Sequence, residues 1–131
     1  MNDMTAPVIL VCGSRDYPLP KLIGEVVGEF NPETIVVEGG ARGVDLWARH
    51  AAQARGLHVA EVKALWERGR SAGHKRNAAM LRLGVTMVVA FWDGKSPGTK
   101  GMIERACAAG IPVSLYREDG SHSMLVVNLL G

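Results

Sequence analysis

The feature that most constrains the fold of this chain is a recurrence of short apolar runs, each followed by a longer amphipathic segment. The apolar runs fall at residues 7–12, 34–38, 58–63, 85–91 and 111–116. Segments with helical spacing fall between them, at residues 20–30, 42–55, 73–83 and 99–109. This pattern predicts parallel strands joined by helices, because strands covered by helices on both faces lack the polar alternation of one-sided sheets.

Glycine marks the ends of three of the expected helices. Gly56, Gly84 and Gly110 each stand just after a helical segment and just before the next apolar run. A glycine at such a position can adopt the left-handed backbone that closes a helix. The chain has 131 residues, the length of one ordinary domain. We therefore expect residues 1–131 to form one α/β domain of three layers around a mainly parallel sheet.

Small and apolar side chains share one face in two of the expected helices. These residues are Val44, Trp47, Ala48 and Ala51 in the second helix, and Met102, Ile103, Ala106 and Cys107 in the fourth. We interpret both faces as core, because helices with such a stripe pack it against a sheet.

The C-terminal part of the chain predicts one more strand. Residues 124–130 are mostly apolar and follow Asp119-Gly120, a pair typical of hairpin turns. We expect this last strand to be either an antiparallel edge strand or a contact between subunits.

Composition narrows the function classes. Hydrophobic residues make up 47% and charged residues 21% of the chain, which excludes disordered and coiled-coil classes. The net charge is +2, so any binding of phosphate or nucleic acid must come from local clustering of cations. Cys12 and Cys107 have no partner at disulfide or metal-ligand spacing, and the four histidines are scattered. We expect a cytoplasmic protein with no metal, no cofactor, no signal peptide and no membrane span.

Glycines and charged residues concentrate directly after the expected strands. Ligands bind at this carboxyl edge in open parallel sheets. We therefore expect one ligand site there, built by four converging loops. The candidate residues are Gly13, Ser14, Arg15 and Asp16; Gly39, Gly40, Ala41, Arg42, Gly43 and Asp45; Trp66, Gly73, Arg76 and Asn77; and Trp92, Asp93, Ser96, Gly98, Thr99 and Lys100.

Cations stand where three of the expected helices begin. Arg42 opens the second helix, Lys75 and Arg76 the third, and Lys100 the fourth. A cation there opposes the helix dipole at a cost of up to about 1 kcal/mol, whereas a bound anion would reverse the sign of that cost. For three helices together we infer a phosphate-bearing ligand. The alternative, favoured for any single residue, is a solvated side chain that reaches sideways from the helix end.

Neither common nucleotide motif is complete. Glu38 occupies the place of the first glycine of the dinucleotide-binding fingerprint, and Val89 stands where the Walker A motif has its leading glycine. Hydride transfer and ATP hydrolysis by a P-loop therefore lose their usual support.

Three candidate ligand residues have a structural alternative. Asp45 could accept hydrogen bonds from ribose hydroxyls, or it could complement the helix dipole or pair with Arg42. Trp66 and Trp92 could stack on a base, although partly buried packing is the commoner role of such a tryptophan.

Four motifs, in their order and spacing, resemble the SLOG superfamily, with the YspA, cpYpsA-related branch most similar. They are Gly13-Ser14-Arg15-Asp16, then Glu38 to Asp45, then Ala72-Gly73 through Arg76-Asn77 and Met80, then Phe91 to Gly94 with Ser96, Gly98 and Thr99. The resemblance implies a Rossmann-like sheet whose glycine-rich loops hold a nucleotide or nucleotide-derived ligand. It also makes a homo-oligomer the expected state. Related families include the LOG enzymes, which hydrolyse the N-glycosidic bond of cytokinin nucleoside monophosphates, and DprA, which binds single-stranded DNA.

The enzymatic part of the resemblance is incomplete. Arg76 and Met80 match the Arg-x-x-x-Met element of LOG enzymes, whose arginine contributes to catalysis. The acid that follows their Gly-Thr pair is replaced by Met102. Glycosidic cleavage needs a carboxylate near the anomeric centre. The candidates are Asp16, Glu38, Asp45 and Asp93, and Arg76, Asp45 and Asp93 form the tentative catalytic set.

Three functions follow, in order of preference. The first is binding of a nucleotide-like phosphate ligand, as in a sensor or signal-binding module. The second is N-glycoside hydrolysis of a nucleoside monophosphate. The third is binding of single-stranded nucleic acid along residues 63–82, where six Lys and Arg stand against one Glu.

Overall fold

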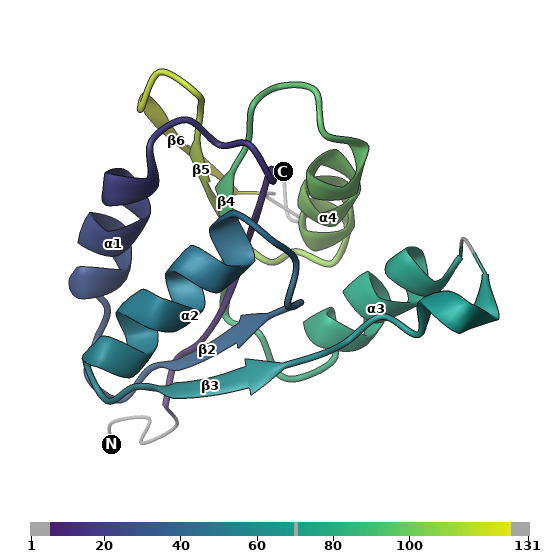
Figure 1. The fold of residues 1–131 in the computed structure, drawn as a ribbon, viewed down its shortest axis with the longest axis horizontal. Helices are drawn as coiled ribbons and strands as arrows, with labels where there is room; N and C mark the ends of the chain where they lie inside the picture. Colours follow the sequence, from purple (N-terminus) through teal and green to yellow (C-terminus); the bar gives the residue numbers. More distant parts are fainter. Residues whose placement is uncertain (1–5, 70, 127–131) are drawn as a thin grey trace.

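The structure is a computed structural model that describes residues 6–69 and 71–126. Strands and helices alternate along the chain as the sequence predicts (Figure 1). The elements are β1 (Val8–Gly13), α1 (Pro20–Gly28), β2 (Ile35–Glu38), α2 (Val44–Ala54), β3 (His58–Glu61), the short 3-10 helix η1 (Trp66–Arg68), α3 (Ala72–Leu81), β4 (Met87–Phe91), α4 (Pro97–Ala108), β5 (Val113–Tyr116) and β6 (His122–Leu125).

The six strands form one sheet in the order β3-β2-β1-β4-β5-β6. Strands β1 to β5 are parallel, and β6 pairs antiparallel with β5, with Tyr116 opposite His122. The chain builds the sheet outwards from β1 to β3 and then returns to the other side of β1 at β4. The strand order therefore reverses between β1 and β4, and open α/β sheets bind ligands in the crevice at such a reversal.

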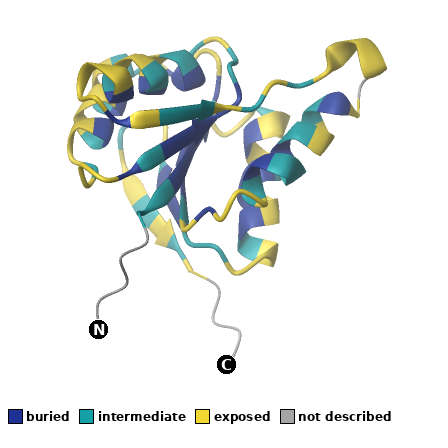
Figure 2. Ribbon diagram, turned by 90° about the horizontal axis from the view of Figure 1, so that it is seen from below, coloured by how far each residue is buried: buried dark blue, intermediate teal, exposed yellow. Residues whose placement is uncertain are grey.

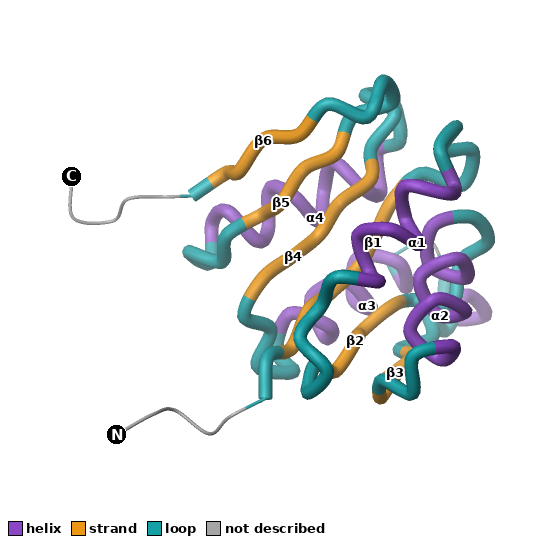
Figure 3. The backbone as a smooth tube through the Cα atoms, turned by 90° about the vertical axis from the view of Figure 1, so that its left-hand side faces the viewer, coloured by secondary structure: helices purple, strands orange, loops and turns teal. Residues whose placement is uncertain are grey.

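Helices cover both faces of the sheet, which makes three layers (Figure 3). Helices α1 and α2 pack on one face, where Ile23, Val27 and Ala48 are buried with side chains of β1 and β4. Helices α3 and α4 pack on the other face, where Met80 and Met102 belong to a second buried cluster. The strands between the layers are mostly buried (Figure 2).

The predicted architecture is confirmed, including the antiparallel edge strand. Gly56, Gly84 and Gly110 all have left-handed backbone, with φ of 74°, 76° and 74°. The main differences are at element ends. Helix α2 begins two residues later than predicted, after Gly43, and β6 begins at His122, two residues earlier than predicted. Residues 127–130 of the predicted last strand lie outside the described residues.

The prediction that Trp47 belongs to the core face of the second helix is wrong. Its side chain is 53% exposed, whereas Val44 and Ala48 are fully buried. Val44, Ala48 and Ala52 repeat every four residues and form the stripe that faces the sheet. Trp47 lies beside this stripe on the solvent side and, with Leu46 and His50, lines a shallow depression.

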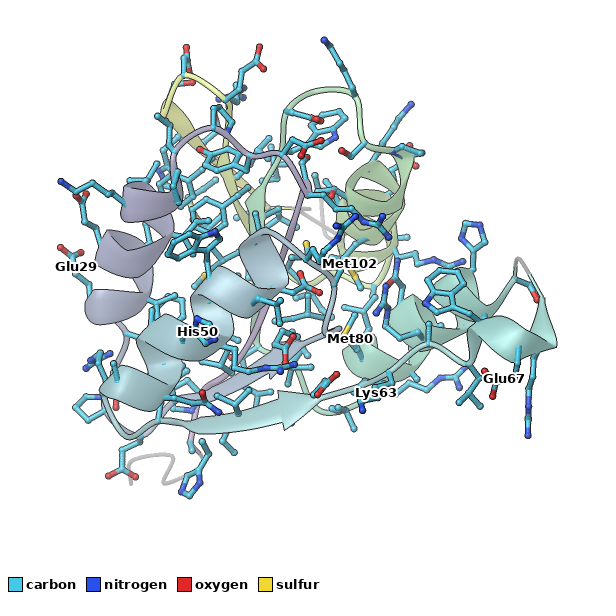
Figure 4. All side chains as sticks on the ribbon, in the orientation of Figure 1. Glu29, His50, Lys63, Glu67, Met80 and Met102 are labelled. Carbon is cyan, nitrogen blue, oxygen red and sulfur yellow. The ribbon has the colours of Figure 1, made fainter. Side chains whose placement is uncertain are left out.

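The segment from β3 to α3 extends away from the body of the domain (Figures 1 and 2). Strand β3 is the short edge of the sheet, and its end residues His58 and Glu61 are exposed. Every residue of η1 is exposed as well. Lys63 and Glu67 both lie along this projecting segment (Figure 4). In the described part of the chain, no helix is long and apolar enough to cross a membrane.

Candidate functional site

A cavity of about 670 Å³ lies at the carboxyl edge of the sheet. It is formed by the segments that follow β1, β2, β3 and β4, together with residues of α2, α3 and α4. Its lining residues are Cys12, Gly13, Ser14, Arg15, Asp16, Gly39, Gly40, Ala41, Arg42, Asp45, Trp66, Arg76, Asn77, Met80, Ser96, Pro97, Gly98, Thr99 and Met102. The four predicted loops therefore do converge on one cavity.

The carboxylate of Asp45 shapes the loop after β2. Its Oδ2 accepts a hydrogen bond of 3.0 Å from the backbone N–H of Gly39 and one of 3.2 Å from that of Ala41. Asp45 stands in the first turn of α2, where a carboxylate complements the helix dipole. In the described residues Asp45 makes no ion pair with Arg42. Its role as a holder of the glycine loop was not among the sequence-based alternatives.

Asp45 is buried, and this burial raises the pKa of its carboxyl group to about 6. The hydrogen bonds from Ala41 and Gly39 and the nearby Arg76 oppose the shift, while the charge of Glu38 adds to it. The group can therefore gain or lose a proton close to neutral pH. Burial likewise raises the pKa of the Cys12 thiol, which keeps this cavity-lining side chain uncharged.

Glu38 also holds the loop after β2, from a position outside the cavity lining. Its side chain is fully buried, and its Oε1 accepts a hydrogen bond of 2.6 Å from the N–H of Gly40. Its Oε2 accepts two hydrogen bonds from Arg49, of 3.0 Å from Nε and 2.7 Å from Nη2. Arg49 also contacts Glu61 Oε1 at 3.0 Å. Because both oxygens of Glu38 are engaged and the residue does not line the cavity, it acts as a structural anchor there.

Arg76 joins α3 to the glycine-containing loop after β2. Its Nη1 donates a hydrogen bond of 2.7 Å to the carbonyl oxygen of Gly39, and its Nε donates one of 2.9 Å to Asn77 Oδ1. The approach is close enough that a methyl group on Gly39 would lie 2.7 Å from Arg76 Cζ. The absence of a side chain at Gly39 is therefore what lets the guanidinium group reach the cavity wall.

Asp93 organises the loop between β4 and α4. Its Oδ1 accepts hydrogen bonds of 2.8 Å and 2.9 Å from the N–H groups of Lys95 and Ser96, and its Oδ2 accepts one of 3.2 Å from Ser96 Oγ. The backbone N–H of Asp93 donates to Ser14 Oγ at 3.1 Å, which ties this loop to the one after β1. The hydrogen bonds that the carboxylate accepts, that from the Ser96 N–H first, lower the pKa of the Asp93 carboxyl group to about 2.

The N-terminus of α4 is open toward the cavity. Pro97 is the first helical residue, no side chain caps the helix, and the first turn has no acidic residue. Gly98 and Thr99 line the cavity, and the first turn of a helix carries N–H groups without a partner inside the helix. This helix end can therefore donate hydrogen bonds to an anion.

Most predicted site residues line the cavity, but five do not: Gly43, Gly73, Trp92, Asp93 and Lys100. Gly43 and Gly73 lie behind Arg15 and Trp66, respectively. Trp92 packs against a core cluster and donates from Nε1 to the carbonyl oxygen of Ser96 at 3.0 Å. Asp93 turns its carboxylate into its own loop, as described above, and Lys100 is exposed on α4.

Four lining residues were not among the predicted site residues: Cys12, Met80, Pro97 and Met102. Cys12 and Met102 were interpreted as parts of a strand and of a helix core face. Met80 is the one with a sequence signal, the Arg-x-x-x-Met element. In the described ranges, no three His, Cys, Asp or Glu side chains gather as they would around a metal ion.

The fold and the cavity define an open α/β domain with a crevice at the strand reversal of its sheet. A family model described as YAcAr, the YspA, cpYpsA-related SLOG family, matches residues 7–69. A "Gene 61 protein" of Mycobacterium phage D29 is 42% identical over 116 residues, which cover 80% of this chain and 92% of that protein. The chain belongs to the YspA, cpYpsA-related SLOG family.

Two solved structures share the fold. DNA processing protein A (DprA) from Streptococcus pneumoniae superposes with a TM-score of 0.74 at 21% identity, over 84% of this chain and 50% of that chain. The structural-genomics target TM1055 superposes with a TM-score of 0.64 at 23% identity, over 82% of this chain and 72% of that chain. This chain thus spans about half the length of DprA. At these identities the likeness is one of fold.

Proposed function

We propose that this chain binds a nucleotide or a nucleotide-derived phosphate ligand in the cavity at the carboxyl edge of the sheet. The observation that carries the proposal is that three arginines, Arg15, Arg42 and Arg76, line the same cavity as the open N-terminus of α4. Guanidinium groups and free backbone N–H groups at a helix N-terminus both bind phosphate in proteins.

Arg15 and Arg42 are available for an anion. Among the described residues, the ion pairs join Arg49 to Glu38 and Glu61, and none involves Arg15 or Arg42. Both side chains are exposed, so they can move onto a ligand. Asp16 and Asp45 also line the cavity, and their carboxylates suit hydroxyl groups of a ribose rather than the phosphate.

Isothermal titration with nucleoside mono- and diphosphates, ADP-ribose and cyclic nucleotides tests the proposal. We expect one binding site per chain and a loss of at least about tenfold in affinity in Arg42→Ala, since one charge-assisted hydrogen bond is worth about 1.5–3 kcal/mol. Arg105→Ala is the matched control, because Arg105 is an exposed arginine of α4 that does not line the cavity. The proposal fails if no compound of the panel binds the folded protein.

A second function, N-glycoside hydrolysis, is favoured by Asp45 and Arg76. Both line the cavity, and the pKa of Asp45 near 6 suits proton transfer at neutral pH. In this reaction water would add to C1′ of the ribose while the bond to the base breaks, and the base would leave with a proton. Asp93 would not take part directly, since it does not line the cavity. Release of free base from AMP, lost in Asp45→Asn, would distinguish hydrolysis from binding alone.

A further inference from the structure

The cavity has an apolar part that a phosphate does not need. Cys12, Met80, Pro97 and Met102 all line it. Met80 and Met102 come from α3 and α4 and lie between these helices and the sheet (Figure 4). Thioether groups are polarizable and contact aromatic rings favourably. This part of the wall therefore suits a flat, uncharged ring.

Trp66 adds an aromatic group to the same cavity. It lines the wall from η1, and its side chain is 59% exposed, the most exposed aromatic side chain among the described large hydrophobic residues. The indole lies against the first turn of α3, because a Cβ on Gly73 would be 2.9 Å from its Cη2 and 3.4 Å from its Cζ3. The absence of a side chain at Gly73 thus leaves room for the far end of the indole, and much of the residue remains exposed.

Trp66 and the N-terminus of α4 follow strands at different places along the carboxyl edge of the sheet. Trp66 follows β3, whereas Gly98 and Thr99 follow β4, and β2 and β1 lie between these strands. Three strand spacings of about 4.8 Å separate the two strands by roughly 14 Å. We therefore expect a ligand that contacts both Trp66 and the N-terminus of α4 to be elongated, with its charge at one end. A nucleotide with its base toward Trp66 and its phosphate toward α4 meets this requirement.

We propose that the ligand carries an intact aromatic base and that this base stacks on Trp66. The absence of a side chain at Gly73 leaves the room that the indole needs in this position. The proposal rests on the proposed function, and it makes Trp66 the residue that separates nucleotides from sugar phosphates. Stacking on an aromatic side chain tolerates every base, because every base has a π-face. Selection among bases is therefore left to other groups of the cavity.

Calorimetric titration with the four common ribonucleoside monophosphates and with ribose 5-phosphate tests the proposal. Ribose 5-phosphate keeps the sugar and phosphate and lacks the base. We expect Trp66→Ala to weaken nucleotide binding about 5- to 150-fold and to leave the affinity for ribose 5-phosphate unchanged. Trp66→Phe should retain most of the nucleotide affinity. Trp47→Ala is the control, since Trp47 is an exposed tryptophan that does not line this cavity.

Gly73→Ala is a second, independent variant. Its new methyl group would displace the far end of the indole, which is exposed and free to move, while alanine improves the helix propensity of α3. We expect weaker nucleotide binding in the folded variant. Gly101→Ala is the matched control, because Gly101 is helical, lies outside the cavity, and has nothing within 4 Å of an added Cβ.

The outcomes separate this proposal from the one on which it rests. If the nucleotides and ribose 5-phosphate bind equally well, and Trp66→Ala changes neither affinity, base stacking is wrong while the anion site stands. If no phosphate compound binds the folded protein, both proposals are wrong. Selective loss of nucleotide affinity in Trp66→Ala and Gly73→Ala supports stacking.

Discussion

The Nη1 group of Arg76 donates a hydrogen bond of 2.7 Å to the carbonyl oxygen of Gly39. This contact joins α3, on one face of the sheet, to the loop that leads into α2 on the other face. Asp45 holds the N–H of Gly39 in turn, at 3.0 Å. The peptide groups of one buried glycine are thus fixed by a cation and a carboxylate that both line the cavity.

Gly39→Ala should disrupt this arrangement. The new methyl group would lie 2.7 Å from Arg76 Cζ and 3.1 Å from Asp45 Oδ2, so that the guanidinium group must leave its position. We expect weaker phosphate binding by calorimetry, with a modest loss of thermal stability, because the arginine end can move. Gly24→Ala, in an exposed part of α1 with nothing within 4 Å of the added Cβ, is the control. Equal affinity in Gly39→Ala and the wild type would contradict the assigned position of Arg76.

The buried carboxyl group of Asp45 predicts a pH dependence of stability. Its pKa is about 6 in the folded protein and near 3.8 in the unfolded chain, so the folded state binds more protons between these values. The unfolding free energy should therefore fall as the pH rises from about 4 to about 6. The full effect of this group is about 3 kcal/mol. Chemical denaturation across pH 4–7 measures it.

Asp45→Asn provides the reference curve for that measurement. The amide oxygen can still accept hydrogen bonds from Gly39 and Ala41, but the group no longer titrates. Subtracting the two curves removes the contribution of other groups, such as Asp93, whose lowered pKa has the opposite sign. If the unfolding free energy of the wild type minus that of Asp45→Asn is flat or rises with pH, the raised pKa of Asp45 is refuted.

Glu38 and Glu61 should differ sharply in their effect on stability, although both contact Arg49. Glu38 is fully buried with both oxygens engaged, and the side chain of Glu61 is 29% exposed. Breaking a buried pair costs about 3–5 kcal/mol, whereas a pair at the surface contributes about 0–1 kcal/mol. We expect Glu38→Gln to lower the unfolding free energy by a few kcal/mol and Glu61→Gln to have little effect. Urea denaturation of both variants checks this, and equal losses would contradict it.

The sequence predicts most of the fold because its signals are local. Continuous apolar runs indicate strands covered on both faces, and glycines such as Gly56 and Gly110 close helices by their own backbone preference. The prediction for Trp47 was wrong because helical spacing does not determine how wide the buried face of a helix is. Val44, Ala48 and Ala52 define the buried direction of α2, and the orientation of the neighbouring Trp47 is set by tertiary packing.

The position of the candidate site could be predicted from the sequence, but the roles of its individual residues could be predicted only in part. Residues after strands gather at one edge by topology alone, which is why Arg15, Arg42 and Thr99 were found. The direction of a side chain is not encoded in its position along the chain. Asp93 and Trp92 follow β4 as predicted, yet hydrogen bonds within their own loop turn them away from the cavity. Their assignment as ligand residues stays a prediction without support from this geometry.

Gly43 is the position where backbone geometry should matter most for the site. It precedes α2 with φ of +86°, and an added Cβ would lie 2.7 Å from Arg15 Cα and 2.8 Å from Arg15 C. Backbone atoms cannot yield as a side-chain end does. With φ of 86° and ψ of −126°, Gly43→Ala must therefore bear the strain of a sparsely populated backbone conformation, about 1–3 kcal/mol, and also move the loop that carries Arg15.

Gly56→Ala separates these two effects. Gly56 has a similar φ of +74°, but nothing lies within 4 Å of an added Cβ. It should show the strain of a positive φ without a close contact, with unchanged phosphate affinity, because Gly56 does not line the cavity. We expect Gly43→Ala to lose more stability than Gly56→Ala in thermal denaturation and to bind phosphate ligands more weakly. Equal losses in the two variants would mean that the close approach of Gly43 to Arg15 does not position the loop.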